Sequence, residues 1–263
     1  MIKLIVSDLD GTLLGYDRRV KQEDKEAVER AVKSGIDFAV ASGRMDNEIL
    51  EVLKELGQKA HRVSQNGAYI YTNADVHLHS VAFETNVARE IYKEARKLEA
   101  IVMVCNEHTN FVEKKTEHVE QIRARLFHDI IEEPNMLEAI GTTIIPSKIT
   151  VIGEEEVVLA FQQKVNEQWQ EHADTFISEP RCLDIMPKHI SKGNAIRSLI
   201  KHLHLKEDEI ACFGDSFNDI PMFRLTPYSF VMSHAHPDVQ KEARYVVHSV
   251  HEAIDIILTK INA

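Results

Sequence analysis

Near its start the chain reads Ile2-Lys3-Leu4-Ile5-Val6-Ser7-Asp8-Leu9-Asp10-Gly11-Thr12, an apolar run that leads into two aspartates and a glycine. Short apolar runs bounded by glycine or aspartate are typical of buried parallel strands. Two similar runs are Ile36–Ala41 and Ile210–Phe213. Between the first two runs, Gln22–Ser34 carries apolar residues at helical spacing and is followed by a glycine. This strand-helix-strand unit predicts a right-handed crossover and a parallel sheet.

The middle of the chain has a different pattern. From about Phe83 to Met186, long helical segments alternate with strands such as Lys148–Ile152 and Thr175–Ser178. From Pro187 the strand-helix pattern of the beginning returns. We therefore predict an α/β protein whose parallel-sheet core, residues 1–82 and 187–263, is interrupted by an inserted α+β domain, residues 83–186. Later helices are predicted over Thr85–Leu98, Glu117–Phe127, Glu154–Gln170, Ser191–Leu203, Pro237–Ala243 and Val250–Ile261.

Composition limits the classes of partner. The 263 residues are 44% hydrophobic and 28% charged, and the 31 Lys and Arg against 42 Asp and Glu give a net charge of −11. An acidic surface repels nucleic acid and anionic lipid, but a locally positive pocket still admits a small anionic substrate. Three scattered cysteines and the absence of an apolar run of ~20 residues indicate no disulfide framework and no membrane span. We expect a cytoplasmic monomer or small homo-oligomer.

Polar residues follow each of the three predicted strands. Asp8 and Asp10 follow the first, Ser42-Gly43-Arg44 follows the second, and Gly214-Asp215-Ser216-Phe217-Asn218-Asp219 follows the third. In an open parallel sheet, ligands bind outside the carboxyl ends of the strands. We therefore expect these residues to meet in one crevice, together with Lys192 at the start of a predicted helix.

Carboxylates gathered this closely repel one another, and a divalent cation removes the repulsion. Oxygen ligands suit Mg²⁺, so we expect Asp8, the main-chain carbonyl of Asp10 and Asp215 to bind it. Asn218 and Asp219 would orient these ligands from outside. The candidates for phosphate or substrate binding are Ser42, Gly43, Arg44, Asn66, Lys192 and Asn218. A carboxylate nucleophile, Mg²⁺ and positioned donors together predict a phosphoryl-transfer site.

The motifs resemble those of the haloacid dehalogenase superfamily. Asp8-Leu9-Asp10-Gly11-Thr12 resembles its first motif, and Ser42, Lys192 and Gly214–Asp219 match the second, third and fourth in order. The spacing of the insertion, with Gln65-Asn66-Gly67-Ala68 and Ile190-Ser191-Lys192-Gly193-Asn194-Ala195, resembles the Cof-type branch with a type IIB cap. The resemblance implies a Rossmann-like core with the insertion as a cap that sets specificity.

The resemblance also implies a reaction. Asp8 would attack phosphorus and form an aspartyl-phosphate, while Asp10 would act as general acid and then as general base. The prediction is a Mg²⁺-dependent phosphatase for a small phosphorylated metabolite, such as a sugar phosphate. Two alternatives remain open: a sugar phosphomutase on the same fold, and a receiver-like module that accepts phosphate on Asp8. One loop departs from the branch, since Met232-Ser233-His234-Ala235 stands where members often have Met-Gly-Asn-Ala.

Overall fold

The chain forms two compact units. The structure, a computed structural model, describes residues 1–15, 17–124, 126 and 129–262. The first unit comprises Met1–Arg44, Ile49–His79 and Ser191–Ala263, and the second comprises Met45–Glu48 and Ser80–Ile190. The sequence-based limits of the insertion were 82/83 and 186/187, whereas the long segment of the second unit begins at Ser80 and ends at Ile190. The short segment Met45–Glu48 was not expected in the second unit.

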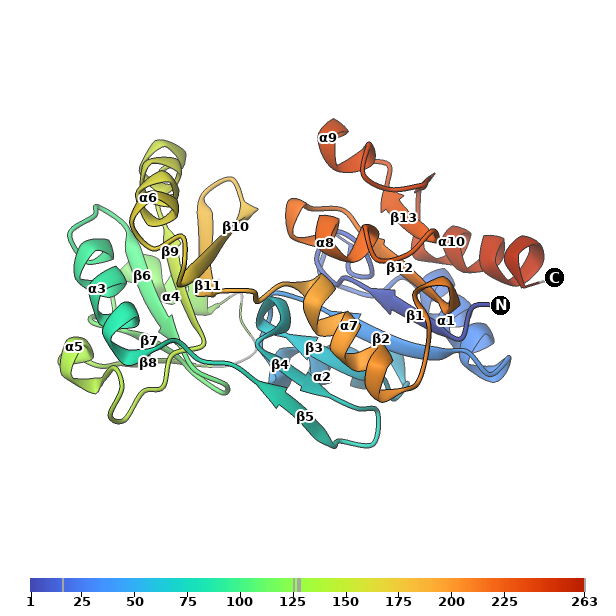
Figure 1. The fold of residues 1–263 in the computed structure, drawn as a ribbon, viewed down its shortest axis with the longest axis horizontal. Helices are drawn as coiled ribbons and strands as arrows, with labels where there is room; N and C mark the ends of the chain where they lie inside the picture. The colour runs from blue at the N-terminus through green and yellow to red at the C-terminus, as the bar shows by residue number, and fades with distance from the viewer. Residues whose placement is uncertain (16, 125, 127–128, 263) are drawn as a thin grey trace. The chain divides into compact units, whose positions relative to one another are not determined.

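An eight-stranded sheet forms the centre of the first unit (Figure 1), in the order β14-β13-β12-β1-β2-β3-β4-β5. The six strands from β14 to β3 pair in parallel, as predicted, whereas β4 pairs antiparallel with β3. This extension of the sheet was not expected from the sequence. The strands are β1 Leu4–Ser7, β2 Asp37–Ala41, β3 His61–Ser64, β4 Tyr69–Tyr71, β5 His77–Ser80, β12 Ile210–Gly214, β13 Ser229–Met232 and β14 Tyr245–Val247.

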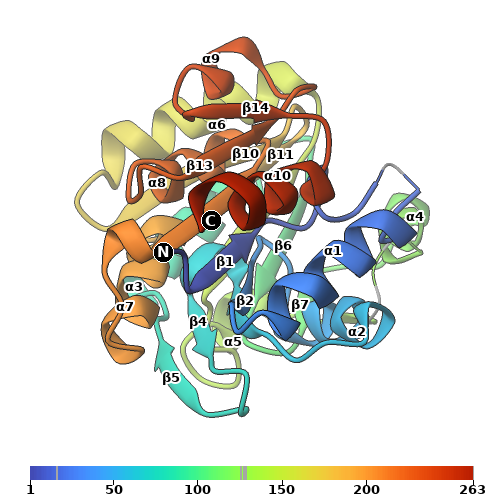
Figure 2. The ribbon, with the colours of Figure 1, turned by 90° about the vertical axis from the view of Figure 1, so that its right-hand side faces the viewer.

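Helices cover both faces of this sheet because its central strands are apolar on both sides. Successive side chains of a strand point to opposite faces. Ile5 of β1 accordingly packs in one apolar cluster with α1, α2 and α10, whereas Leu4 and Val6 pack in another with α7, α8 and α9. Figure 2 shows α1 beside α10. These helices are α1 Gln22–Lys33, α2 Asp46–Leu56, α7 Lys192–His202, α8 Ile220–Phe223, α9 Pro237–Gln240 and α10 Val250–Ile256.

The second unit is a separate α+β layer structure. Its sheet has the order β10-β11-β9-β6-β7-β8 and is antiparallel except for the pair β7–β8. Helices α3 and α6 pack against Val104, Ile149 and Leu183 on one face. The strands are β6 Ile101–Cys105, β7 Asn110–Val112, β8 Ile130–Glu132, β9 Lys148–Ile152, β10 Ala173–Glu179 and β11 Cys182–Pro187, and the helices are α3 Thr85–Ala95, α4 Glu117–Arg123, α5 Met136–Ala139 and α6 Glu155–Gln168.

Where a helix was predicted, the observed α-helix begins within one residue of the predicted start and ends before the predicted end. The helix predicted over Glu117–Phe127 is observed as α4, which ends at Arg123, and Phe127 lies outside the described residues. The helix predicted over Val250–Ile261 is α10 followed by a π-helical turn, Ile257–Ile261. Short 3₁₀ turns are η1 Gln65–Gly67, η2 Glu207–Glu209 and η3 Phe217–Asp219. Within the described part of the chain, no helix has the length and apolar character needed to cross a membrane.

Candidate active site

The residues predicted to form the site all belong to the first unit, at the carboxyl ends of its central strands. Asp8 follows β1, Ser42 follows β2 and Asp215 follows β12. Main-chain hydrogen bonds continue beyond the strands, because the N–H of Asp8 donates to the carbonyl of Phe213 and the N–H of Ser42 donates to that of Val63, each over 2.9 Å. The parallel register therefore brings three distant parts of the sequence to the same edge of the sheet.

Lys192 lies fully buried between two carboxylates. Its Nζ donates to Oδ1 of Asp8 over 2.6 Å and to Oδ1 of Asp219 over 2.7 Å. Burial by itself would lower the pKa of Lys192, but Asp219 and Asp8 outweigh it and hold the pKa above its ordinary value. Ser191 caps the helix that carries this lysine, since its Oγ accepts from the N–H of Asn194. Lys192 is thus a fixed cation that ties α7 to β1.

Asp219 is held entirely by donors of the protein. Its Oδ1 accepts from Lys192, and its Oδ2 accepts from the N–H groups of Asp215 and Ser216, each over 2.9 Å. The side chain therefore fixes the turn that follows β12. The pairing of Asp219 with Lys192 was not foreseen from the sequence.

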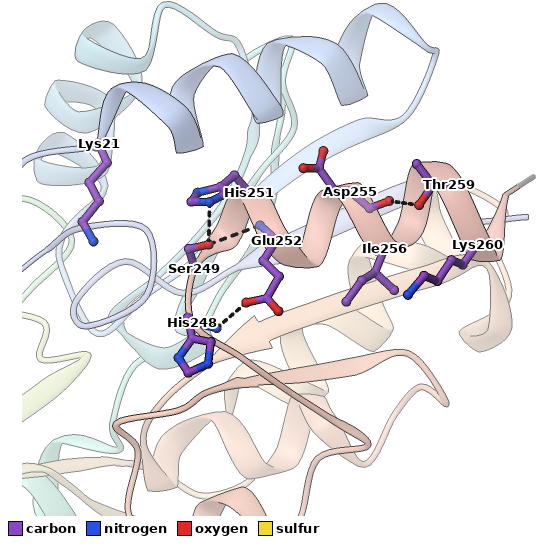
Figure 3. A pocket seen from close by; sticks show the side chains of 9 residues that line it. All are labelled: Lys21, His248, Ser249, His251, Glu252, Asp255, Ile256, Thr259 and Lys260. Atoms are coloured by element: carbon purple, nitrogen blue, oxygen red, sulfur yellow. Dashed lines mark hydrogen bonds between the residues drawn. The ribbon is translucent and has the colours of Figure 1, made fainter.

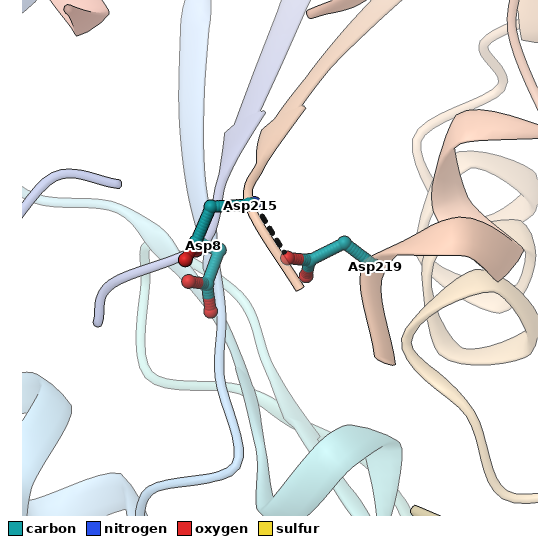
Figure 4. A group of neighbouring side chains, drawn as sticks. All are labelled: Asp8, Asp215 and Asp219. Atoms are coloured by element: carbon teal, nitrogen blue, oxygen red, sulfur yellow. Dashed lines mark hydrogen bonds between the residues drawn. The ribbon is translucent and has the colours of Figure 1, made fainter. Parts of the chain in front are cut away.

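Asp8, Asp215 and Asp219 form an acidic cluster (Figure 4), with one oxygen of each within 4.8 Å of the others. Burial raises the pKa of Asp8 well above its ordinary value, Lys192 opposes this, and the neighbouring carboxylates add to it. Burial and the charge of Asp219 raise the pKa of Asp215 to about 6. A cation bound between such buried carboxylates favours their ionised forms and so lowers their pKa values. Because Asp219 is already engaged, the donor set that fits Mg²⁺ is Asp8 and Asp215.

Two further side chains contact Asp215. The hydroxyl of Thr12 donates to Oδ1 over 2.9 Å, and Nε2 of His234 lies 3.7 Å from Oδ2. No role was expected for Thr12, although it stands in the first motif and its hydroxyl was the available signal. His234, which marks the departure from the family pattern, therefore lies beside a candidate metal ligand.

Asp10 forms a two-pronged ion pair with Arg44. Nε and Nη2 of the guanidinium donate to the two carboxylate oxygens over 2.8 and 2.6 Å. The Asp10 side chain is about half exposed, whereas that of Arg44 is largely buried. Ser42 is buried, and its Oγ accepts from the N–H of Arg44, so its hydroxyl hydrogen can be donated elsewhere. The loop after β2 thus presents a hydroxyl and positions Asp10.

Asn66 and Asn218 are joined by a hydrogen bond beneath this loop. Nδ2 of Asn218 donates to Oδ1 of Asn66 over 3.1 Å, and both residues are buried. The side chain of Asn66 lies against Gly43, because a methyl group there would come within 3.4 Å of its amide. All of the predicted site residues are therefore brought together.

Gly11 gives a test of how closely the first motif approaches Asp215. Its φ is +81°, and a methyl group there would lie 2.3 Å from Oδ2 of Asp215. Gly35, with φ +86°, has nothing within 4 Å of the same position. We expect Gly11→Ala and Gly35→Ala each to lose about 1–2 kcal/mol of stability from the left-handed backbone. Only Gly11→Ala should also weaken Mg²⁺ binding, because Asp215 must move.

Isothermal titration of Mg²⁺ into both variants, with thermal unfolding in parallel, checks this expectation. Equal Mg²⁺ affinity in the two variants would contradict the close approach of Gly11 to the ligand.

A separate pocket is lined by Lys21, which precedes α1, and by residues of α10 and the segments on either side of it (Figure 3), and none of the candidate site residues lines it. Beside it, Nδ1 of His251 lies 2.9 Å from Oδ1 of Asp24, and Oγ of Ser249 lies 3.1 Å from Nε2. The N–H of His251 donates to the same Asp24 oxygen, and Ser249 caps α10. These contacts hold α10 to α1, so we assign them a structural role.

Comparisons with curated proteins place the chain among phosphatases. A protein of Serratia proteamaculans named HMP-PP phosphatase is 27% identical over 243 residues, which cover 91% of this chain and 87% of that protein. The protein of the same name from Escherichia coli O157:H7 is 25% identical, over 98% of this chain and 95% of its own length.

Solved structures and a family model agree with these relatives. A haloacid dehalogenase-like hydrolase from Bacteroides thetaiotaomicron superposes with a TM-score of 0.86 at 25% identity, covering 98% of this chain and all of that one. A Thermotoga maritima protein superposes with a TM-score of 0.83 at 26% identity, covering 96% and 94%. The predicted fold is thereby confirmed. Residues 5–257 match the model of the haloacid dehalogenase-like hydrolases, and the chain belongs to that family.

Proposed function

We propose that this protein is a Mg²⁺-dependent phosphatase for small phosphomonoesters, such as sugar phosphates or related metabolites. The observation that carries the proposal is the buried Lys192, which joins Asp8 to Asp219 beside Asp215. This set combines a carboxylate nucleophile, a fixed cation and oxygen ligands for a metal. Phosphoryl transfer needs these parts together, because its barrier is lowered mainly by positioning and by neutralising charge.

The first half of the reaction belongs to Asp8. Its carboxylate attacks phosphorus and forms an aspartyl-phosphate, while Lys192 holds it in place and neutralises developing negative charge. Ser42 donates its hydroxyl hydrogen to a phosphoryl oxygen. Mg²⁺, held by Asp8, Asp215 and the carbonyl of Asp10, supplies further charge neutralisation when bound.

Asp10 acts in both halves of the reaction. After protonating the leaving alkoxide, Asp10 takes a proton from the water that cleaves the aspartyl-phosphate. The guanidinium of Arg44 only donates, so in the observed pair both oxygens of Asp10 serve as acceptors, which suits the base step. The two-pronged pair also restricts rotation of the Asp10 carboxyl group.

Two observations favour hydrolysis over the alternatives. The curated relatives are named phosphatases, which supports hydrolysis over a mutase. A receiver-like module would need only the unit that carries the site, whereas this chain has a second unit as well. In this proposal it acts as a cap that excludes water and selects the leaving group.

Phosphate release from a panel of sugar phosphates, nucleotides and phosphorylated cofactors tests the proposal. We expect turnover with Mg²⁺ and none with a chelator. Formation of an isomeric or bisphosphorylated sugar without inorganic phosphate would instead identify a phosphomutase. Stable phosphorylation of Asp8 without repeated turnover would identify the binding module.

The raised pKa of Asp215 predicts a pH-dependent affinity for Mg²⁺. Because the metal binds the carboxylate form, a proton competes with it below the pKa of about 6. We expect little change in affinity between pH 8 and pH 7, and a loss of about tenfold per pH unit below pH 6 for each proton displaced. Calorimetry in buffers of different ionisation enthalpy counts the protons released. A constant affinity from pH 8 to pH 5 would contradict the assignment of Asp215 as a ligand.

A further inference from the structure

The turn η1, Gln65–Gly67, has an unusual backbone at the centre of the site. Gln65, Asn66 and Gly67 have φ values of 47°, 56° and 114°, so three consecutive residues lie in the left-handed region. Such a conformation is costly for residues other than glycine, and asparagine tolerates it better than most. It persists where the surrounding structure holds it, and such turns are concentrated at functional sites.

The turn η1 contacts three segments that contain candidate site residues. The N–H of Asn66 donates to the carbonyl of Ser42 over 2.9 Å, and the N–H of Gln65 donates to that of Arg44 over 2.8 Å. Gly67 lies against Ser191, the N-cap residue of α7, since a methyl group on Gly67 would come within 2.7 Å of the carbonyl of Ser191. The same turn therefore contacts the loop after β2 and the start of the helix that carries Lys192.

The third contact fixes the amide of Asn218. Its Nδ2 donates to Oδ1 of Asn66, which sets the orientation of the amide. Its Oδ1 is buried, and no donor among the described residues reaches it. A buried acceptor of this kind costs free energy unless a donor arrives, so its orientation prepares it for a donor from water or ligand in the loaded site.

We infer that Asn66 is a positioning residue, which fixes Asn218 and the Ser42–Arg44 loop relative to each other without touching the substrate. This inference rests on the proposed phosphatase function. The side chain of Asn66 is fully buried, its Oδ1 accepts a hydrogen bond from Asn218, and its amide group packs on Gly43. Its left-handed backbone lets the N–H bond to Ser42 and the side-chain bond to Asn218 form together.

Two substitutions separate this role from a purely structural one. Asn66→Gly keeps the left-handed backbone without strain and removes the amide, whereas Asn66→Ala removes the amide and adds strain. We expect both variants to lose about 10–100-fold in kcat/KM, as is typical when a partner that orients a site residue is removed. Only Asn66→Ala should show a clearly lower Tm. Wild-type kinetics in Asn66→Gly would overturn the inference.

A double-mutant cycle tests the partner. If Asn66 acts through Asn218, Asn66→Gly should add little to the loss already caused by Asn218→Ala. Losses that multiply in the double variant would overturn the assignment.

A third experiment uses NMR spectroscopy and does not require turnover. The side-chain amide signals of Asn218, assigned by their absence in Asn218→Ala, should move and exchange faster with solvent in Asn66→Gly. Unchanged signals would overturn the inference. If the wild-type protein releases no phosphate, the proposed function fails, and this experiment still decides whether Asn66 positions Asn218.

Discussion

Asp8→Asn should abolish phosphate release, with a loss of at least about 10⁴-fold in kcat, because an amide cannot serve as the nucleophile. The substitution keeps the shape of the side chain, and Lys192 keeps its second partner, Asp219. The variant should therefore fold. Phosphate release under saturating substrate and Mg²⁺ measures the effect, and mass spectrometry of acid-quenched wild-type protein should find phosphate on the peptide that contains Asp8.

An exposed aspartate provides the matched control. Asp208→Asn changes the same chemical group outside the site and should leave kcat unchanged. Turnover by Asp8→Asn within tenfold of the wild type would remove Asp8 from the role of nucleophile.

Among the proposed variants, Lys192→Met should show the largest loss of stability, together with a loss of activity. The lysine is fully buried between Asp8 and Asp219, so its removal leaves two buried carboxylates without their cation. Breaking a buried pair in this way typically costs ~3–5 kcal/mol. We expect a loss of that size in urea unfolding at pH 7.5, and a loss of about 10²–10³-fold in kcat because charge neutralisation near the phosphoryl group disappears.

The stability defect should also depend on pH. Burial already raises the pKa of Asp8 and Lys192 opposes this, so without Lys192 the folded-state pKa of Asp8 rises further and the folded variant binds a proton that the unfolded chain does not. The variant should therefore regain stability relative to the wild type as the pH falls from 7.5 to 5. Lys201→Met, at an exposed position of the same helix, is the control and should unfold like the wild type. A Lys192→Met protein as stable as this control would contradict the buried bridge.

The convergence of the site could be predicted because it depends on a rule of topology. Asp8, Ser42 and Asp215 each follow an apolar run, and parallel pairing alone brings the ends of such runs to one edge of a sheet. Lys192 could be placed by its position at the start of a helix. These inferences needed only the order of elements, not their exact ends.

Other features escaped the sequence analysis for different physical reasons. Helix α2 had a usable signal, because Ile49, Val52, Leu53 and Leu56 repeat at helical spacing. Strand β5 had little, because most of its side chains are exposed and no apolar alternation marks it.

The contacts within the site were harder to foresee. The pairs Asp10–Arg44 and Asn66–Asn218 join residues from separate motifs, and the spacing of motifs does not show which side chains bond to each other. Thr12 lay within a recognised motif, but its contact with Asp215 depends on how closely two loops approach.

Both carboxylate oxygens of Asp219 accept hydrogen bonds, and this affects which cation can bind beside it. Calcium takes about six to eight oxygen ligands, including carboxylates, carbonyls and water, whereas magnesium keeps several of its own water molecules and is usually bound by one or two carboxylates. Asp219 cannot turn toward a larger ion without giving up Lys192 and two main-chain donors. In the proposed phosphatase, we therefore expect the same hydrogen bonds that stabilise the turn after β12 to favour the smaller ion.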